Sequence, residues 1–502
     1  MRHQYATLWI WFFLLPLALD YKATDANVGH FAQTALVVPA VATGLALLLI
    51  APRFRDRSRL RSVVTFSMLL CVFGSIVAQF IQDNDTGNYL RVVLPFALFL
   101  LGYLVACRPW SEYRISQFER ALFFANVICL VFTFVYGMTT GMAAPGGDLE
   151  DVRFRIISVT LLGLQGVLLH EFIVAKRFSF FTIAVFAGTV IVELLSVTRS
   201  LLVGAVLLFL LAMALSAPSI RQIWRAAART LIVSAVLAGV AAIAALSFPA
   251  IAEHWTERIF ASEETVTGKD PTTVTRLAEM RDQYDQVTAS PETLLFGAGY
   301  GHYYHYSPVY LPDLAGQISE QDFYAINEWA AGHNFWVYQL FAGGLLFGVA
   351  MPLATLVALA VCFCSYRYWR SVVPDAPMLP VLGRAIMLFA GLPAMSIGGN
   401  PLGPRFSGLV FGVALGLMIA THARLQRALP ARIKRVRTPP HLRPAAMPEL
   451  PGRIQPGMGR ADLATALGMS RAATAAPGSR PYGALVSRTP STQRPNRPKL
   501  AR

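Results

Sequence analysis

The sequence predicts an all-α polytopic membrane protein with about twelve transmembrane helices. The chain has 502 residues, of which 55% are hydrophobic and only 14% are charged. Soluble domains carry about 25% charged residues. Repeated apolar runs of about 20 residues can each cross the ~30 Å hydrocarbon core as a helix, whereas a membrane β-barrel has shorter, alternating segments.

Twelve segments have the composition of a membrane span. The first follows Arg2 and resembles a signal peptide, but no small-residue cleavage site precedes Asp20, so we expect an uncleaved helix. The expected spans cover residues 5–19, 31–51, 62–82, 89–107, 120–141, 155–174, 178–196, 200–217, 230–248, 333–363, 379–397 and 405–423. The tenth is long and contains Pro352, which predicts a tilt, a kink or an extension beyond the bilayer.

The charges of the connecting segments predict the orientation. Basic connections, such as residues 53–61 with five arginines, alternate along the chain with neutral or acidic ones, such as residues 83–85. Basic connections remain in the cytoplasm. We therefore expect both termini in the cytoplasm and the long connection 249–332 on the outer side.

The chain is expected to have four parts: nine helices over 1–248, an outer loop over 249–332, three helices over 333–423 and a tail over 424–502. The loop has 13 acidic and four basic residues, and we interpret it as a lid at the membrane surface. The tail has 16 lysines and arginines and two acidic residues, a net charge of +14. Its Pro, Arg, Ala and Ser content predicts disorder, and its charge favours anionic lipid over nucleic acid.

Cysteine and histidine positions do not predict a disulfide framework or a metal site. The five cysteines lie in apolar spans or at their edges, and none lies in the outer loop. His302 and His305 have i, i+3 spacing without a third ligand nearby. With Tyr303 and neighbouring tyrosines they could form an aromatic platform for a sugar ring, or the packed core of the loop.

Arginines on the outer side run against the usual charge distribution. Arg199 lies in a tight outer turn, where it either extends to water or binds an anion such as phosphate with its planar donor fork. Arg276 begins a segment with helical spacing, and is either a solvated or ion-paired side chain or a second anion ligand. Arg153, Arg155 and Arg405 flank outer helix ends.

His333 and Asn334 open the tenth span. An imidazole changes charge near neutral pH and can accept a proton from a sugar hydroxyl or from water. The alternative is structural: Asn334 is a residue type that caps helices, and an interfacial histidine is commonly a packing residue.

Three motifs follow one another along the chain. The first is Thr-Arg-Ser-Leu-Leu at 198–202, the second is Arg276-Leu277 followed by Pro-Glu-Thr-Leu-Leu-Phe-Gly-Ala-Gly-Tyr-Gly at 291–301, and the third is Gly-His-Asn-Phe-Trp at 332–336, continuing to Gly348. In this order they resemble the O-antigen ligase and polymerase family of bacterial polysaccharide assembly. Ser200 replaces the family's usual glycine and Val337 its usual leucine, and neither change removes a polar group.

The resemblance implies a GT-C-like glycosyltransferase of the bacterial inner membrane that needs no metal or cofactor. The donor would be an undecaprenyl-pyrophosphate-linked oligosaccharide. The acceptor hydroxyl would belong to another lipid-linked repeat in a polymerase or to lipid A core in a ligase. We favour the polymerase, because an acidic loop disfavours phosphorylated lipid A core. A flippase and a chain-length regulator are expected partners.

The resemblance also implies roles for individual residues. His333 would activate the acceptor hydroxyl, and Arg199 and Arg276 would hold the pyrophosphate as it leaves. Further contacts to substrate are expected from Asn334, Arg155, Arg405, His302 and Tyr303. A transporter of polysaccharide or lipid-linked sugar is the alternative from another class, but it would favour a central, cytoplasmic long loop.

Overall fold

The computed structural model describes residues 2–21, 27–54, 57–142, 152–153, 155–217 and 267–437, with isolated residues between 218 and 266. The predicted ninth span, 230–248, the first part of the predicted outer loop and the tail from Thr438 onward lie largely or wholly outside the described residues. Within these residues the chain is helical, with one isolated β-bridge between Tyr304 and Glu328 and no strand.

Six of the described helices are long and apolar enough to cross a membrane. They are α3 (Arg59–Gln82), α4 (Thr86–Ala106), α5 (Glu112–Met142), α9 (Arg199–Ser216), α16 (Ala350–Val372) and α18 (Ser407–Arg437). Shorter apolar segments lie in α1 (Arg2–Ala18), α2 (Asn27–Ile50), α7 (Leu161–Leu169) with the π turn η1 (His170–Val174), α8 (Phe180–Leu195), α15 (Phe335–Gly343) with the π turn η4 (Gly344–Gly348), and α17 (Leu379–Met395). The all-helical fold class is thus confirmed over the described residues, and the apolar helices among them are those of a membrane protein by length and composition, while the number of crossings stays a prediction.

Among the described helices, α4 and α18 form the most closely packed pair. Gly408, Gly412 and Gly416 recur every fourth residue on α18, and a Cβ at each would overlap atoms of α4, mostly of its backbone. Gly102 of α4 meets the backbone of α18 in the same way. Small residues at this spacing let two helix backbones approach, which is the usual basis of helix association in lipid.

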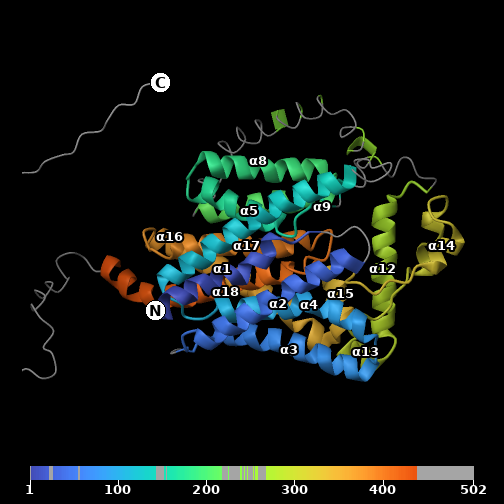
Figure 1. Cartoon of the computed structure of the whole chain (residues 1–502), viewed down its shortest axis with the longest axis horizontal. Coiled ribbons are helices and arrows are strands. Elements are labelled where there is room, and N and C mark those ends of the chain that lie inside the picture. Colours follow the sequence, from blue (N-terminus) through green and yellow to red (C-terminus); the bar gives the residue numbers. More distant parts are fainter. Residues whose placement is uncertain are drawn as a thin grey trace, which may run out of the picture. The chain divides into compact units, whose positions relative to one another are not determined.

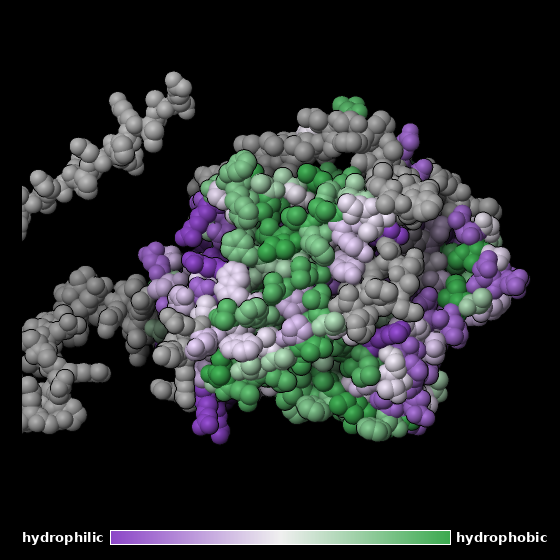
Figure 2. Space-filling view, viewed as in Figure 1, coloured by the Kyte–Doolittle hydropathy of each residue, from purple (hydrophilic) through white to green (hydrophobic). Residues whose placement is uncertain are grey.

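On one face of the helical body, the surface has an apolar belt between two hydrophilic ends (Figure 2). Figure 2 shows the belt in green between purple surfaces, as expected for a protein with a hydrocarbon-facing zone. At one end, helix α12 (Pro271–Thr288) runs across the ends of the long helices instead of beside them (Figure 1). Helices α13 (Pro291–Phe296) and α14 (Glu320–Ala325) lie at this end too, which we call the α12 end.

The predicted tenth span is broken into two helices. Helix α15 stops at Gly343, and Gly344 adopts a φ of +59°, a left-handed conformation that favours glycine. A Cβ on Gly344 would overlap the backbone of Leu295 and Gly297, so α13 packs directly on the break. The interruption therefore lies at Gly344 and precedes Pro352, which sits inside α16.

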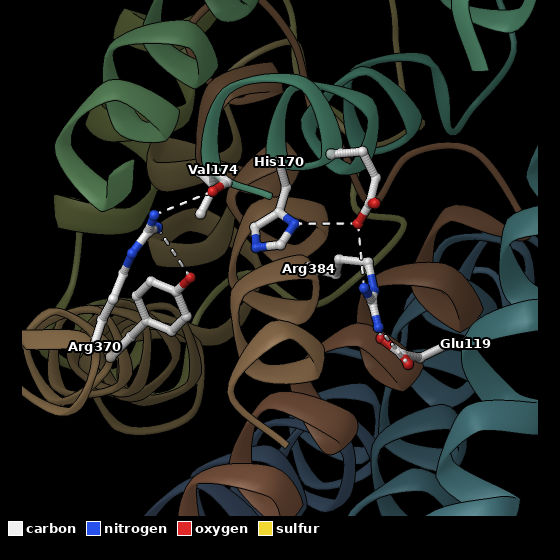
Figure 3. A network of polar contacts seen from close by, with 7 residues as sticks. Glu119, His170, Val174, Arg370 and Arg384 are labelled. Carbon is white, nitrogen blue, oxygen red and sulfur yellow. Dashed lines mark hydrogen bonds and ion pairs between the residues drawn. The ribbon is translucent and has the colours of Figure 1, made fainter. Parts of the chain in front are cut away.

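A network of charged side chains joins four elements at the opposite end of the long helices (Figure 3). Arg384 of α17 contacts both carboxylate oxygens of Glu119 of α5, at 2.9 and 3.0 Å, and Glu171 Oε1 at 3.2 Å. Glu171 also faces His170 Nδ1 at 3.4 Å. Arg370 of α16 donates to the carbonyl of Val174 at 3.1 Å. We call these residues the Arg384 network.

Helix α9 connects the two ends of the fold. Arg199 is its first residue, and the carbonyl of Leu215, near its last, accepts a hydrogen bond from Arg370 Nη1 at 3.0 Å. At 1.5 Å per residue, Arg199 and Leu215 are about 24 Å apart along the helix. The charges at the α12 end are therefore separated from the Arg384 network by most of an apolar span.

Candidate functional site

A cavity of about 340 Å³ lies where the start of α9 meets α12 and the segment before α15. Its walls are formed by Arg153, Ser196, Val197, Thr198, Arg199, Ser200, Thr272, Thr275, Arg276, Glu279, Tyr306 and His333. The structure thus brings Arg199, Arg276 and His333, each predicted from a different motif, to one cavity.

The tight turn between α8 and α9 forms one wall. Val197 has a φ of +46°, a left-handed conformation that is uncommon and strained for a β-branched residue. Thr198 then precedes α9 at the N-cap position, but its side chain makes no hydrogen bond to the first amide groups of the helix. Because the N-terminus of a helix carries a partial positive charge and unsatisfied N–H groups, this wall favours an anion.

Arg199 is held by a carboxylate from the start of α12. Its Nη2 donates to Asp270 Oδ2 at 2.6 Å, and Thr273 Oγ1 donates to the same oxygen at 2.7 Å. Burial raises the pKa of Asp270, but the hydrogen bonds from Thr273 and Arg199 outweigh it and hold this pKa below its ordinary value. Asp270 is therefore ionised at neutral pH, and it links α9 to α12.

Helix α12 presents one polar face to the cavity. Thr272, Thr275, Arg276 and Glu279 follow i, i+3, i+4, i+7 spacing, which places them on one side of a helix. Arg153, which is only 9% exposed, adds a further guanidinium from the segment between α5 and α7. Three arginines therefore line a cavity that also contains several hydroxyl groups.

His333 is bound twice by Glu279. Its backbone N–H donates to Glu279 Oε1 at 2.7 Å, and its ring Nδ1 lies 2.7 Å from Glu279 Oε2. The Glu279 side chain is 2% exposed, whereas that of His333 is 59% exposed. A carboxylate accepts hydrogen bonds, so the neutral ring carries its proton on Nδ1 and leaves Nε2 for a molecule in the cavity.

Asn334 does not line the cavity. Its side-chain oxygen accepts from the backbone N–H groups of Trp336 at 3.0 Å and Val337 at 3.1 Å, which makes it the N-cap of α15. This is the structural alternative that the sequence left open. By capping the N-terminus of α15, Asn334 fixes where the helix begins and so the position of His333, the residue directly before the cap.

His302 and Tyr303 also lie away from the cavity lining. His302 Nδ1 is 2.6 Å from Asn84 Oδ1, and the hydroxyl of Tyr303 accepts from Asn88 Nδ2 at 3.1 Å. Burial lowers the pKa of His302. His302 therefore attaches the loop to the connection between α3 and α4, and Tyr303 attaches it to the first turn of α4. His305 has another partner, the carbonyl of Ile326 at 2.7 Å.

Arg155 and Arg405 are half-buried and are likewise not among the lining residues. Arg153, two positions before Arg155, lines the cavity instead. Within the residues that the structure describes, no group of three or more His, Cys, Asp and Glu side chains is arranged to hold a metal ion.

Glu279 and Asp270 are site residues that sequence reasoning missed. A signal for Glu279 was present, because it follows Arg276 by three residues and so shares its helix face. For Asp270 no comparable local signal exists, since its partner Arg199 is 71 residues away.

Comparison with known proteins does not identify a family. No protein-family model matches the chain, and no curated protein has a significantly similar sequence.

Proposed function

We propose that this protein is a membrane glycosyltransferase that transfers a glycan from an undecaprenyl-diphosphate carrier to a sugar hydroxyl. The observation that carries the proposal is the shared cavity of Arg199, Arg276 and His333. The motif resemblance assigns these three residues to one reaction, and their meeting in space supports that assignment.

The arginines and the start of α9 fit a diphosphate. A guanidinium presents paired donors to phosphate oxygens and keeps its charge at any physiological pH. Arg153, Arg199 and Arg276 together face negative charge that increases on the diphosphate as the glycosidic bond breaks, and this stabilises the transition state more than the ground state.

His333 fits the acceptor side of the reaction. The acceptor oxygen attacks the anomeric carbon, and its proton passes to His333 Nε2. The bond between the anomeric carbon and the phosphate oxygen breaks, and its electron pair stays on the leaving diphosphate. Attack from the face opposite the leaving group inverts the anomeric centre.

The size of the cavity fits a part of this substrate. About 340 Å³ is near the lower end of the range for small-molecule sites. It has room for the diphosphate and the reacting sugar, so the remainder of the oligosaccharide extends beyond α12. The polyprenyl chain leaves toward the apolar belt.

The charge pattern supports a location in the bacterial inner membrane with both termini in the cytoplasm. In that orientation the α12 end faces the periplasm, where carrier-linked glycans are present after they have been flipped. The basic residues of the tail, at 424–502, then lie at the anionic cytoplasmic surface.

Polymerase and ligase use the same donor and differ in the acceptor. We favour the polymerase, because the acidic loop disfavours phosphorylated lipid A core. The glycolipids of a deletion strain separate the two. Single repeats without polymer indicate a polymerase, whereas long polymer retained on the undecaprenyl carrier indicates a ligase.

The direct test uses purified protein in lipid nanodiscs with an undecaprenyl-diphosphate oligosaccharide. Arg199→Ala, Arg276→Ala and His333→Ala should each abolish measurable transfer. Arg281→Ala is the matched control, because Arg281 lies on the same helix as Arg276 but pairs with Asp285 at 3.0 Å and does not line the cavity. Normal transfer by all three site variants contradicts the proposal. Movement of labelled substrate across vesicles without transfer favours the transporter.

A further inference from the structure

We propose that Glu279 is a positioning residue that fixes the ring orientation and the tautomer of His333, so that Nε2 is the nitrogen that accepts the acceptor's proton. This inference rests on the proposed glycosyl transfer. It assigns a role to a residue that belongs to none of the motifs that carried the resemblance.

Three donors converge on the Glu279 carboxylate. Oε1 accepts from the backbone N–H of His333 at 2.7 Å and from Gln283 Nε2 at 3.2 Å, and Oε2 faces His333 Nδ1 at 2.7 Å. A buried carboxylate is destabilising unless its oxygens accept hydrogen bonds. The side chain of Glu279 is only 2% exposed, so the carboxylate depends on the hydrogen bonds from His333 and Gln283 for its stabilisation.

The two contacts to His333 determine its ring position as well as its protonation. One contact fixes the backbone of His333 and the other fixes Nδ1, so the imidazole cannot rotate without losing a hydrogen bond to a buried charge. The carboxylate cannot donate, so the neutral imidazole must keep its proton on Nδ1. The lone pair of the ring is then on Nε2.

Gly332 makes this approach possible. A Cβ at position 332 would overlap both Gln283 Nε2 and Glu279 Oε1. The glycine of the Gly-His-Asn motif therefore lets the chain before α15 lie directly against α12. The motif therefore supplies both the proposed base, His333, and the glycine that lets this segment approach Glu279.

Helix α12 couples the two halves of the reaction. Arg276 and Glu279 are three residues apart on one rigid element, so the group that holds the leaving diphosphate and the group that orients the base keep a constant separation. Any displacement of α12 changes both together.

The test compares Glu279→Gln with the wild type. An amide has one acceptor oxygen and one NH₂ group, so it cannot accept from both His333 donors. Its NH₂ favours the tautomer that carries the proton on Nε2. We expect kcat to fall by roughly 10²–10⁴-fold, the usual contribution of a general base. The affinity for undecaprenyl diphosphate should be unchanged, because the three arginines are intact.

Asp285→Asn is the matched control, since Asp285 is an exposed carboxylate of α12 that pairs with Arg281. ¹⁵N NMR of histidine-labelled protein reads the tautomer directly, with His333→Gln to assign the resonance. The wild type and Asp285→Asn should show a proton on Nδ1, and Glu279→Gln should show it on Nε2.

Three outcomes overturn the positioning role: an unchanged kcat in Glu279→Gln, an unchanged tautomer, or a loss of diphosphate affinity parallel to the loss of kcat. The last would make Glu279 a structural residue. Because the NMR measurement needs no turnover, the expected tautomer exchange in a protein that transfers no glycan would reject the glycosyltransferase function and leave the His333–Glu279 geometry standing.

Discussion

The Arg199 guanidinium and the Asp270 carboxylate form an ion pair of 2.6 Å between the first residue of α9 and the residue that precedes α12. Arg199 is the residue that we expect to bind a diphosphate, and one of its donors already contacts the carboxylate of Asp270. A bound diphosphate must share this guanidinium with Asp270 or displace it. The Arg199–Asp270 ion pair therefore influences the affinity for diphosphate and also links α9 to α12.

Removing the Asp270 charge should strengthen diphosphate binding. In Asp270→Asn the amide keeps an oxygen for the Thr273 hydroxyl but competes less well for Arg199. The Arg199 side chain is 38% exposed, and pairs of this kind contribute about 0.2–1 kcal/mol, so we expect the Kd for undecaprenyl diphosphate to fall by roughly 1.5- to 5-fold. Titration calorimetry in nanodiscs measures it. A higher Kd, and so weaker binding, would show that Asp270 orients Arg199 for the ligand.

The same pair predicts a pH dependence of stability. The pKa of Asp270 is lower in the folded chain than its ordinary value of 3.8, so its contribution to stability is complete above pH 3.8. It is lost as the pH falls through the lowered pKa. The difference in thermal unfolding temperature between wild type and Asp270→Asn should be constant near neutral pH and shrink at more acidic pH. A difference that grows on acidification has the wrong sign.

The close contact of α4 and α18 should tolerate no added side chain. In Gly412→Ala the new Cβ meets the carbonyl of Phe99, and a backbone atom cannot rotate away. Overpacking of this kind costs about 1–3 kcal/mol, so we expect a lower unfolding temperature in detergent. Gly188→Ala on α8 is the control, because its Cβ meets only Leu130 at 3.9 Å. Equal unfolding temperatures for both variants would contradict this packing.

The helical body could be predicted from sequence because a span is a local property. Apolar length alone identifies α4 or α18. The break at Gly344 could not be predicted in this way, because it depends on the backbone of Leu295 and Gly297 approaching from another segment. Pro352, the local signal for a kink, lies within an uninterrupted α16.

The site could be predicted in part for a similar reason. Arg199, Arg276 and His333 stood out because charged or titratable groups at the edges of apolar spans are conspicuous. Glu279 did not, since its partner His333 is 54 residues away and acids are common in the loop. The choice between Arg153 and Arg155 depends on which side chain faces the cavity, and this is a property of the folded chain.

The Arg384 network should stabilise the fold without acting in the cavity. Arg384→Met leaves the carboxylates of Glu119 and Glu171 without their shared guanidinium, and breaking such a pair costs about 3–5 kcal/mol when it is fully buried. These side chains are 16–23% exposed, so we expect the lower part of that range. The measurement is the unfolding temperature in detergent, where Arg384→Met should unfold well below the wild type.

The double variant Arg384→Met with Glu119→Gln distinguishes two causes of the lost stability: the loss of the ion-pair attraction, and the cost of leaving the Glu119 carboxylate without a partner. If the cost arises from the unpaired Glu119 carboxylate, its neutralisation should restore part of the lost stability, because removing both partners leaves fewer uncompensated charges. Arg384 lies at the far end of α9 from Arg199, so the diphosphate Kd of the folded fraction should equal that of the wild type. A double variant no more stable than Arg384→Met would assign the cost to the lost attraction instead of the unpaired carboxylate. A changed Kd would show that the network acts beyond its own end of the fold.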